Sequence, residues 1–219
     1  PLRAGDGVNL DGVLVSGAIT DIDGSSPVDS VTITAINNDS EISSTNFHYV
    51  DGLTLDPTTA NLTISGNIDN DDSSAVTKTG AGTLIMSNMT QTLTADIHVN
   101  EGTLRGAGTT NGDNPVFGSG EIRLADGTSL VLEGEGDKWS GYDYNNTVHV
   151  DGAAATLQAY TGENDGTRIE TVVVNTAATI TADMFQRSRF YIDNLTLNDD
   201  AVIDGVNSRY GNRNDPGND

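Results

Sequence analysis

The chain has 219 residues, of which 5% are aromatic and none is cysteine, so disulfides, thiolate metal sites and cysteine nucleophiles are excluded. Its formal net charge of −22 argues against a nucleic-acid partner and against anionic membrane surfaces, because both need a basic face. No apolar run is long enough for a membrane-spanning helix. Abundant Gly, Thr, Asn and Asp favour short strands joined by tight turns.

The first sixty residues have an irregular strand pattern. The chain begins at Pro1 rather than Met, and we expect that an N-terminal segment has been removed from it. Residues 13–15 and 31–33 alternate as short strands do, and residues 21–27 between them are rich in turn formers. We therefore predict less regular coils over residues 1–60 and regular coils over residues 61–205.

From residue 61 onward, a strand, a polar turn and a second strand recur. The apolar anchors of the second strand follow at steps of 22, 20, 26, 27, 23 and 23 residues. They are Leu62, Leu84, Leu104, Leu130, Leu157, Ile180 and Ile203. A near-constant step is typical of a solenoid, in which each coil buries the apolar face of its neighbours.

The spacing thus predicts an all-β fold, a parallel β-helix of about eight or nine coils. We expect it to be right-handed, because crossovers between parallel strands almost always are. A seven-stranded sandwich is the alternative architecture, since short strands at regular spacing fit both. The sandwich is disfavoured because its antiparallel strands need no repeated sequence.

Residues 76–106 contain the sequence Gly-Thr-Leu twice, and each copy opens an alternating strand. The stretch resembles the autotransporter-associated β-strand repeat, with the pattern K-T-G-x-G-T-L-x-L-S followed by V-N-x-G-T-L. The matching residues are Lys78, Thr79, Gly80, Gly82, Thr83, Leu84 and Ser87, then Val99, Asn100, Gly102, Thr103 and Leu104. Met86 and Asn88 depart from the pattern, which has Leu and Gly there. The resemblance implies a β-helix in a secreted or surface-displayed bacterial protein and no particular activity.

The two ends of a solenoid are open sheet edges that need a cap or a partner. Residues 181–191 are the one segment with a possible helical pattern, with Thr181 or Asp183 as its N-cap. Residues 206–219 have no strand pattern and are predicted to form an extended tail, which a neighbouring chain would hold in place.

Acidic residues gather at three turns and are candidate calcium ligands, because carboxylates on tight turns suit this ion. They are Asp21 and Asp23; Asp69, Asp71 and Asp72; and Asp199 and Asp200. None of the turns has the spacing of an EF-hand or of the glycine-rich nonapeptide repeat. The alternative interpretation is a solvated acidic surface.

Two groups of residues are candidates for contacts with a partner. The first is an aromatic loop with Trp139, Tyr142 and Tyr144, which would stack on a sugar ring, bind a protein or pack on the rod. The second lies near the C-terminus and contains Arg187, Arg189, Phe190, Tyr191, Arg209, Tyr210 and Arg213. Because residues 1–77 carry only one basic residue, Arg3, the second group favours head-to-tail contact between copies.

Together, these features predict a non-enzymatic structural protein of the bacterial cell surface or extracellular matrix. Its copies would associate end to end into a filament or layer. An adhesin module that binds glycan or a host or matrix protein through the aromatic loop is the alternative. A polysaccharide-active enzyme is the third hypothesis, although no nucleophile motif is present and no pair of acidic residues is singled out by spacing.

Overall fold

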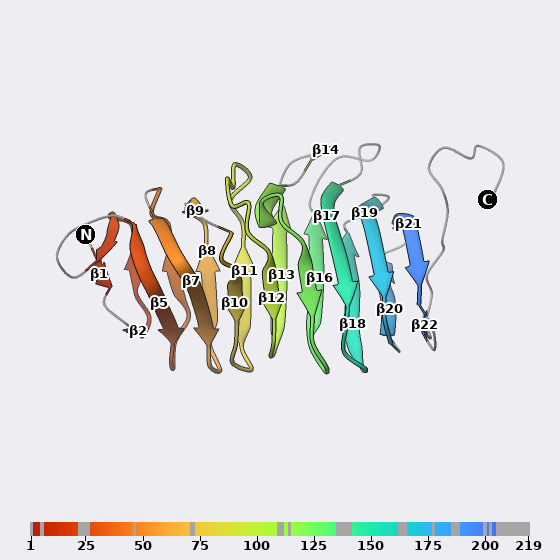
Figure 1. The fold of residues 1–219 in the computed structure, drawn as a ribbon, viewed down its shortest axis with the longest axis horizontal. Helices are drawn as coiled ribbons and strands as arrows, with labels where there is room; N and C mark the ends of the chain where they lie inside the picture. The colour runs from red at the N-terminus through yellow and green to blue at the C-terminus, as the bar shows by residue number, and fades with distance from the viewer. Residues whose placement is uncertain are drawn as a thin grey trace.

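Two parallel sheets run along the length of the protein and wind into a solenoid in a computed structural model of the chain (Figure 1). The described residues are 2–4, 7–21, 27–45, 47–70, 73–108, 112–113, 115–134, 142–161, 166–176, 178–184, 189–198, 201 and 203–204. The strand pairs formed within these ranges are parallel. Parallel pairing confirms the predicted solenoid and rules out the sandwich.

The main path of the first sheet runs through β1 (Leu2–Ala4), β4 (Ile19–Asp21), β7 (Phe47–Pro57), β10 (Val76–Lys78), β12 (Ile97–Val99), β15 (Ile122–Leu124), β17 (Tyr142–Val150), β19 (Gly166–Val174) and β21 (Arg189–Leu197). Beside this path lie β2 (Gly7–Leu10), β5 (Val28–Ala35), β9 (Ile68–Asn70) and β14 (Gly112–Asp113). The second sheet runs through β3 (Leu14–Val15), β6 (Ser40–Ile42), β8 (Asn61–Ile64), β11 (Thr83–Met86), β13 (Thr103–Gly108), β16 (Ser129–Gly134), β18 (Ala155–Thr161), β20 (Ala178–Met184) and β22 (Ile203–Asp204).

Six of the seven predicted anchors pair directly along the second sheet. They are Leu62, Leu84, Leu104, Leu130, Leu157 and Ile180. The seventh prediction is wrong, because Ile203 pairs with Ala178 rather than with Ile180. Because side chains alternate along a strand with a period of two, a shift of two residues leaves the apolar alternation in phase. The apolar pattern therefore does not distinguish the two registers.

Burial follows the alternation of residues along each strand. In β12, Ile97 and Val99 are buried in the core, whereas His98 between them is half-buried on the outer face. The inward side chains of successive coils stack into columns, and Leu84, which is fully buried, lies between its neighbours of the preceding and following coils. The side chains of a column are removed from water only when coils stack on one another. The stability of the fold therefore depends on contacts between neighbouring coils.

The repeated Gly-Thr-Leu sequence marks a turn at which successive backbones nearly touch. Gly80 and Gly102 have φ angles of +72° and +67°, a region that favours glycine. A Cβ atom on Gly82 would lie 2.2 Å from the carbonyl oxygen of Ala60, and one on Gly102 would lie 2.5 Å from that of Gly80. The glycines of this sequence are thus required by the close stacking of turns.

Two predictions about the ends of the fold are wrong. The solenoid has about six regular turns, fewer than the predicted eight or nine coils. The terminal strands are short or irregular; β3 and β22, for example, have two residues each. The predicted helix over residues 181–191 is replaced by β20 and the start of β21, because Thr181 and Asp183 pair in register with β18.

Helical structure is slight in the described part of the chain. The 3-10 helix η1 (Pro115–Phe117) has three residues. Across those same ranges, no helix combines the length and the apolar character needed to cross a bilayer.

Gly106 occupies an inward position where neighbouring coils carry larger residues. It pairs with Met86 on one side and Leu132 on the other. The space that its side chain would fill is taken by two aromatic rings, since a Cβ on Gly106 would lie 2.6 Å from Phe117 and 3.1 Å from Tyr144. The aromatic pair therefore completes the core at this coil.

We expect Gly106→Leu to lower the free energy of unfolding by about 1–3 kcal/mol, because overpacking forces the rings out of place. The matched control is Ala107→Leu, which adds the same side chain one residue later on the outer face, where Ala107 is half-buried. Urea unfolding of both variants checks the prediction. An equal effect of the two changes would contradict it.

Candidate functional site

The aromatic residue Tyr144 belongs to the core and not to an exposed contact surface. Its side chain is 1% exposed, and its ring lies 5.7 Å from that of Phe117, measured between centroids. The hydroxyl donates a hydrogen bond of 2.7 Å to the carbonyl oxygen of Glu133, and the carbonyl oxygen of Gly106 lies 3.3 Å from the same hydroxyl. The expectation that Tyr144 contacts a glycan or protein is therefore wrong. Trp139 lies outside the described residues, and Tyr142 is placed only by its backbone in β17.

The C-terminal group of candidate contact residues also contains one core residue, two residues placed by their backbones and four that are not described. Phe190 is 1% exposed and packs in the core, so it is not a surface contact. Arg189 and Tyr191 are placed by their backbones in β21. The remaining candidates, Arg187, Arg209, Tyr210 and Arg213, lie outside the described residues.

The acidic turns are only partly described. Asp21 ends β4, and Asp69 lies in β9, with its carboxylate 3.3 Å from the imidazole of His48 and accepting a hydrogen bond from the backbone N–H of Asn70. The other candidate calcium ligands, Asp23, Asp71, Asp72, Asp199 and Asp200, lie outside the described residues. Among the residues that the structure does describe, no three His, Asp or Glu side chains gather in a way that would hold a metal ion.

The outer face of the first sheet carries a row of basic side chains. His98, Arg123 and His149 are paired in register on three successive coils. The guanidinium of Arg123 lies 2.9 Å from the carboxylate of Glu121 and 3.3 Å from that of Asp151, and His149 lies 3.2 Å from Glu121. These side chains point outward as expected. The contacts of Arg123 with Asp151 and of His149 with Glu121 join adjacent coils.

Asparagine and aspartate side chains link successive coils at the outer turns of the N-terminal half. Hydrogen bonds from the side chains of Asn38 and Asn37 lower the pKa of Asp11. The backbone N–H of Asn61, together with its side chain, lowers the pKa of Asp39 in the same way. The carboxylates are thus held in the charged form by amide donors of the neighbouring coil.

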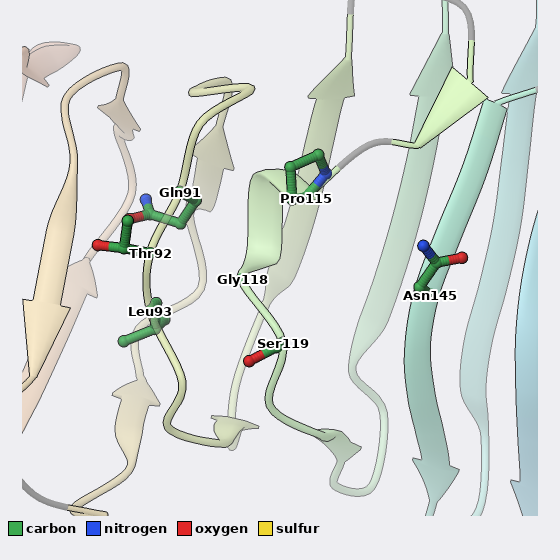
Figure 2. Close-up of a pocket in the computed structure, with 7 residues that line it drawn as sticks. All are labelled: Gln91, Thr92, Leu93, Pro115, Gly118, Ser119 and Asn145. Carbon is green, nitrogen blue, oxygen red and sulfur yellow. The ribbon is translucent and has the colours of Figure 1, made fainter.

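A cavity of about 450 Å³ lies between two loops on one side of the solenoid (Figure 2). It is lined by the uncharged residues Gln91, Thr92, Leu93, Pro115, Gly118, Ser119 and Asn145. Figure 2 shows residues 91–93 on one segment, residues 115–119 on the next and Asn145 on β17. The side-chain oxygen of Gln91 accepts a hydrogen bond of 2.8 Å from the backbone N–H of Ile68, which holds this wall to the preceding coil. With no titratable group in its lining, the cavity offers no acid–base pair of its own.

Lys78 is a buried cation that the sequence analysis did not single out beyond its match to the repeat. It occupies an inward position in β10 between Leu55 and Val99, and its side chain is fully buried. The Nζ atom donates hydrogen bonds to three carbonyl oxygens, those of Thr79, Gly80 and Glu101. The alternation of inward and outward positions along residues 76–78 could have identified Lys78 as an inward-facing residue.

The turn around Lys78 binds its ammonium group but does not offset the cost of burying the charge. Burial lowers the pKa of Lys78 to about 8, although the nearby carboxylates of Asp56 and Glu101 act to raise it. The three acceptors come from its own turn and from the following coil, so the ammonium joins two coils at the Gly-Thr-Leu turn. Its role is therefore structural.

The two ends of the solenoid expose large apolar side chains, of which Leu14 lies on the outer face, in register with Glu41. Among the described residues, the exposed large apolar side chains are Val13, Leu14, Leu195 and Leu197, with exposures of 43%, 62%, 40% and 52%. Leu14 lies in β3 and directly follows Val13, and Leu195 and Leu197 lie in β21; β3 and β21 are each the last strand at one end of their sheet over the described residues.

The two leucines continue core columns past the last turn. Leu195 pairs with Val172 and Leu197 pairs with Val174, and both valines are fully buried. The valines are buried because β21 covers them, whereas β21 is the last strand of its sheet over the described residues. Another coil stacked on β21 would bury the leucines in the same way.

The N-terminal end is open in the second sheet. Leu14 pairs with Glu41, so Val13 lies opposite Ser40, at the head of the column that contains Leu62. The backbone carbonyl of Val13 accepts a hydrogen bond of 2.9 Å from Glu41. At this edge of the described chain, Val13 is thus an exposed side chain in register with the buried column of the second sheet.

Comparison with known protein families, with characterised proteins and with solved structures finds no match to this chain.

Proposed function

We propose that this protein is a stiff structural rod whose copies associate end to end into a filament or layer. The observation that carries the proposal is the location of exposed apolar surface. The large apolar side chains exposed in the described residues are divided between the first and last coils, while those of the described coils between them are buried or half-buried. Apolar patches of this kind mark interaction sites, and open sheet edges recruit further strands.

The proposed setting is the bacterial cell surface or extracellular matrix. It is supported by the resemblance of residues 76–106 to the autotransporter-associated β-strand repeat and by the absence of cysteine. The Gly-Thr-Leu turns give this resemblance a physical basis, because their glycines allow coils to stack closely. We propose that the solenoid is right-handed, in keeping with the general preference of parallel crossovers.

Association should depend on concentration and on salt. Each copy carries a formal charge of −22, so copies repel one another at low ionic strength. Salt screens this repulsion and leaves apolar contact between the ends largely intact. We expect the mass in solution, measured by light scattering, to rise above the 22.9 kDa of one chain as protein and salt concentrations increase.

Electron microscopy of the same samples should show rods joined along their long axis. A mass of one chain at every protein and salt concentration would overturn the proposed function.

A further inference from the structure

We propose that the cavity between residues 91–93, residues 115–119 and Asn145 binds one unit of a neutral sugar (Figure 2). This binding function goes beyond the proposed rod and does not depend on whether copies assemble. The residues that form the cavity differ from the aromatic contact residues expected from the sequence, of which Tyr144 is buried in the core. The volume of about 450 Å³ falls within the usual range of small-molecule sites, about 300–1,000 Å³.

The cavity lies where two irregularities interrupt the regular coils. Its three walls belong to successive coils, because β12, β15 and β17 are neighbours in the first sheet. The 3-10 helix η1 precedes β15, and the register of β17 against β19 shifts between Tyr144 and Thr147, a span that contains Asn145. Bulges of this kind are frequent next to active sites, where they redirect a side chain. The hollow is therefore a feature of these coils and not of the repeat.

Hydrogen bonds between coils hold the walls in place. The backbone N–H of Ser119 donates a hydrogen bond of 2.9 Å to the carbonyl oxygen of Leu93, which joins two of the walls. The side-chain amide of Asn146, next to the third wall, donates to the carbonyl oxygens of Gly118 at 3.2 Å and Gly120 at 2.8 Å. A site that is formed before its ligand arrives loses less conformational freedom on binding. The cavity is thus preorganised.

The lining determines the charge of the ligand. The seven residues that line the cavity are uncharged, whereas the whole chain has a formal charge of −22. An anion would be repelled by the surrounding protein. A cation would be attracted to the protein as a whole, but none of the seven lining residues has a carboxylate to bind it. A neutral ligand is therefore favoured.

The chemistry of the lining matches a sugar ring. Such a ring has hydroxyl groups around its rim and apolar C–H groups on its faces. The lining offers both kinds of partner: the amides of Gln91 and Asn145, the hydroxyls of Thr92 and Ser119, and the apolar residues Leu93 and Pro115. Figure 2 shows that the hydroxyl of Ser119 points toward the segment of residues 91–93.

A peptide fits this lining less well than a sugar. A peptide added along a strand needs unpaired backbone groups on the protein. Here the backbone N–H groups of Thr92, Gly118 and Ser119 already donate hydrogen bonds within the chain. The groups left to a ligand are therefore chiefly side chains, as sugar recognition requires.

Gln91 provides a second observation that points to a ligand. The residue is 7% exposed, and its Oε1 atom accepts the hydrogen bond from Ile68. Its Nε2 atom is buried and has no hydrogen-bond partner among the described residues. A buried donor without a partner is costly, so an acceptor oxygen that enters the cavity supplies a hydrogen bond that the protein lacks.

Saturation-transfer NMR of the full chain with two pairs of sugars tests the class of ligand. Galactose is compared with galacturonate, and N-acetylglucosamine with glucosamine, in slightly acidic buffer where glucosamine is a cation. We expect at least one neutral sugar to bind with a Kd on the order of 1 mM, and its charged counterpart to bind about 10-fold more weakly. Binding of neither neutral sugar, or equal binding of the charged counterpart, would overturn the inference.

Three variants locate the binding site. Ser119→Trp places a large side chain at an exposed position of the lining and should abolish binding of the neutral sugar. Gln91→Glu keeps the acceptor for Ile68, removes the Nε2 donor and adds a negative charge, so binding should weaken about 10-fold. Ala153→Trp, at an exposed turn between β17 and β18 outside the lining, is the matched control and should bind as the wild type does.

Sugar binding that survives in Ser119→Trp would contradict the proposed site, and so would its loss in a folded Ala153→Trp variant. Thermal unfolding shows whether each variant is folded. If Ser119→Trp unfolds, hydrogen exchange of the wild type decides the question. A saturating neutral sugar should slow exchange at residues 91–93 and 115–119 more than in other parts of the chain. Slower exchange only at other residues would overturn the inference while leaving the proposed rod untouched.

Discussion

Leu104→Asp should leave the chain without a cooperative unfolding transition at 25 °C. The Leu104 side chain is fully buried and stacks between Leu84 and Leu130 of the neighbouring coils. A carboxylate at this position would lie in an apolar column, where burying it costs several kcal/mol beyond the lost leucine packing, out of a total stability of about 5–15 kcal/mol for most domains. Because a solenoid is stabilised by contacts between neighbours, the loss at one central coil separates the two halves of the rod.

The matched control places the same charge one residue earlier. Thr103 is half-buried on the outer face of β13, so Thr103→Asp should change the free energy of unfolding by no more than about 1 kcal/mol. Circular dichroism and urea unfolding measure both variants. If the two substitutions have equal effects, the assignment of inward and outward residues in the Gly-Thr-Leu strands is wrong.

The repeat of apolar anchors was sufficient to predict the parallel solenoid and most of its register. A column such as that of Leu104 leaves its mark in the sequence because the same inward position must be apolar in coil after coil. The prediction failed at two places: the pairing of Ile203, and the segment over Thr181, which is a strand rather than a helix. In both cases, pairing with the preceding strand decided the structure, and the apolar pattern permitted more than one answer.

The candidate sites were harder to predict than the fold. In the sequence, Tyr144 belongs to a polar, aromatic loop of the kind that contacts partners. Its burial depends on the missing side chain of Gly106, which lies 38 residues away. Leu195 and Leu197 have the ordinary pattern of a core strand. Their exposure follows from the absence of a further coil over β21 in the described chain, which no local pattern records.

Lys78→Met should lower the free energy of unfolding by about 2 kcal/mol at pH 7. The methionine fills a similar volume but leaves the carbonyl oxygens of Thr79, Gly80 and Glu101 without the donor that now binds them. Each buried acceptor left unpaired costs about 1–3 kcal/mol, and relief from burying a charge offsets part of this loss. Urea unfolding of the variant and the wild type at pH 7 measures the difference.

The same difference should grow as the pH rises from about 8 to about 10. The pKa of Lys78 is lowered from its ordinary value of 10.5 to about 8 in the folded protein, chiefly by burial. Between these values the unfolded chain holds a proton that the folded chain has released, so the stability of the wild type increases with pH relative to the variant. The slope approaches about 1.4 kcal/mol per pH unit, and it vanishes below pH 8, where both states are protonated.

Thr77→Met is the control for this pH dependence, because it adds the same side chain at the adjacent outward position without removing a titrating group. Its effect on the free energy of unfolding should be the same at pH 7 and pH 10. A difference between wild type and Lys78→Met that stays constant or shrinks over this range would show that the three carbonyls hold the proton on Lys78. In that case, hydrogen bonding to the ammonium outweighs its burial, and the turn is built around a permanent positive charge.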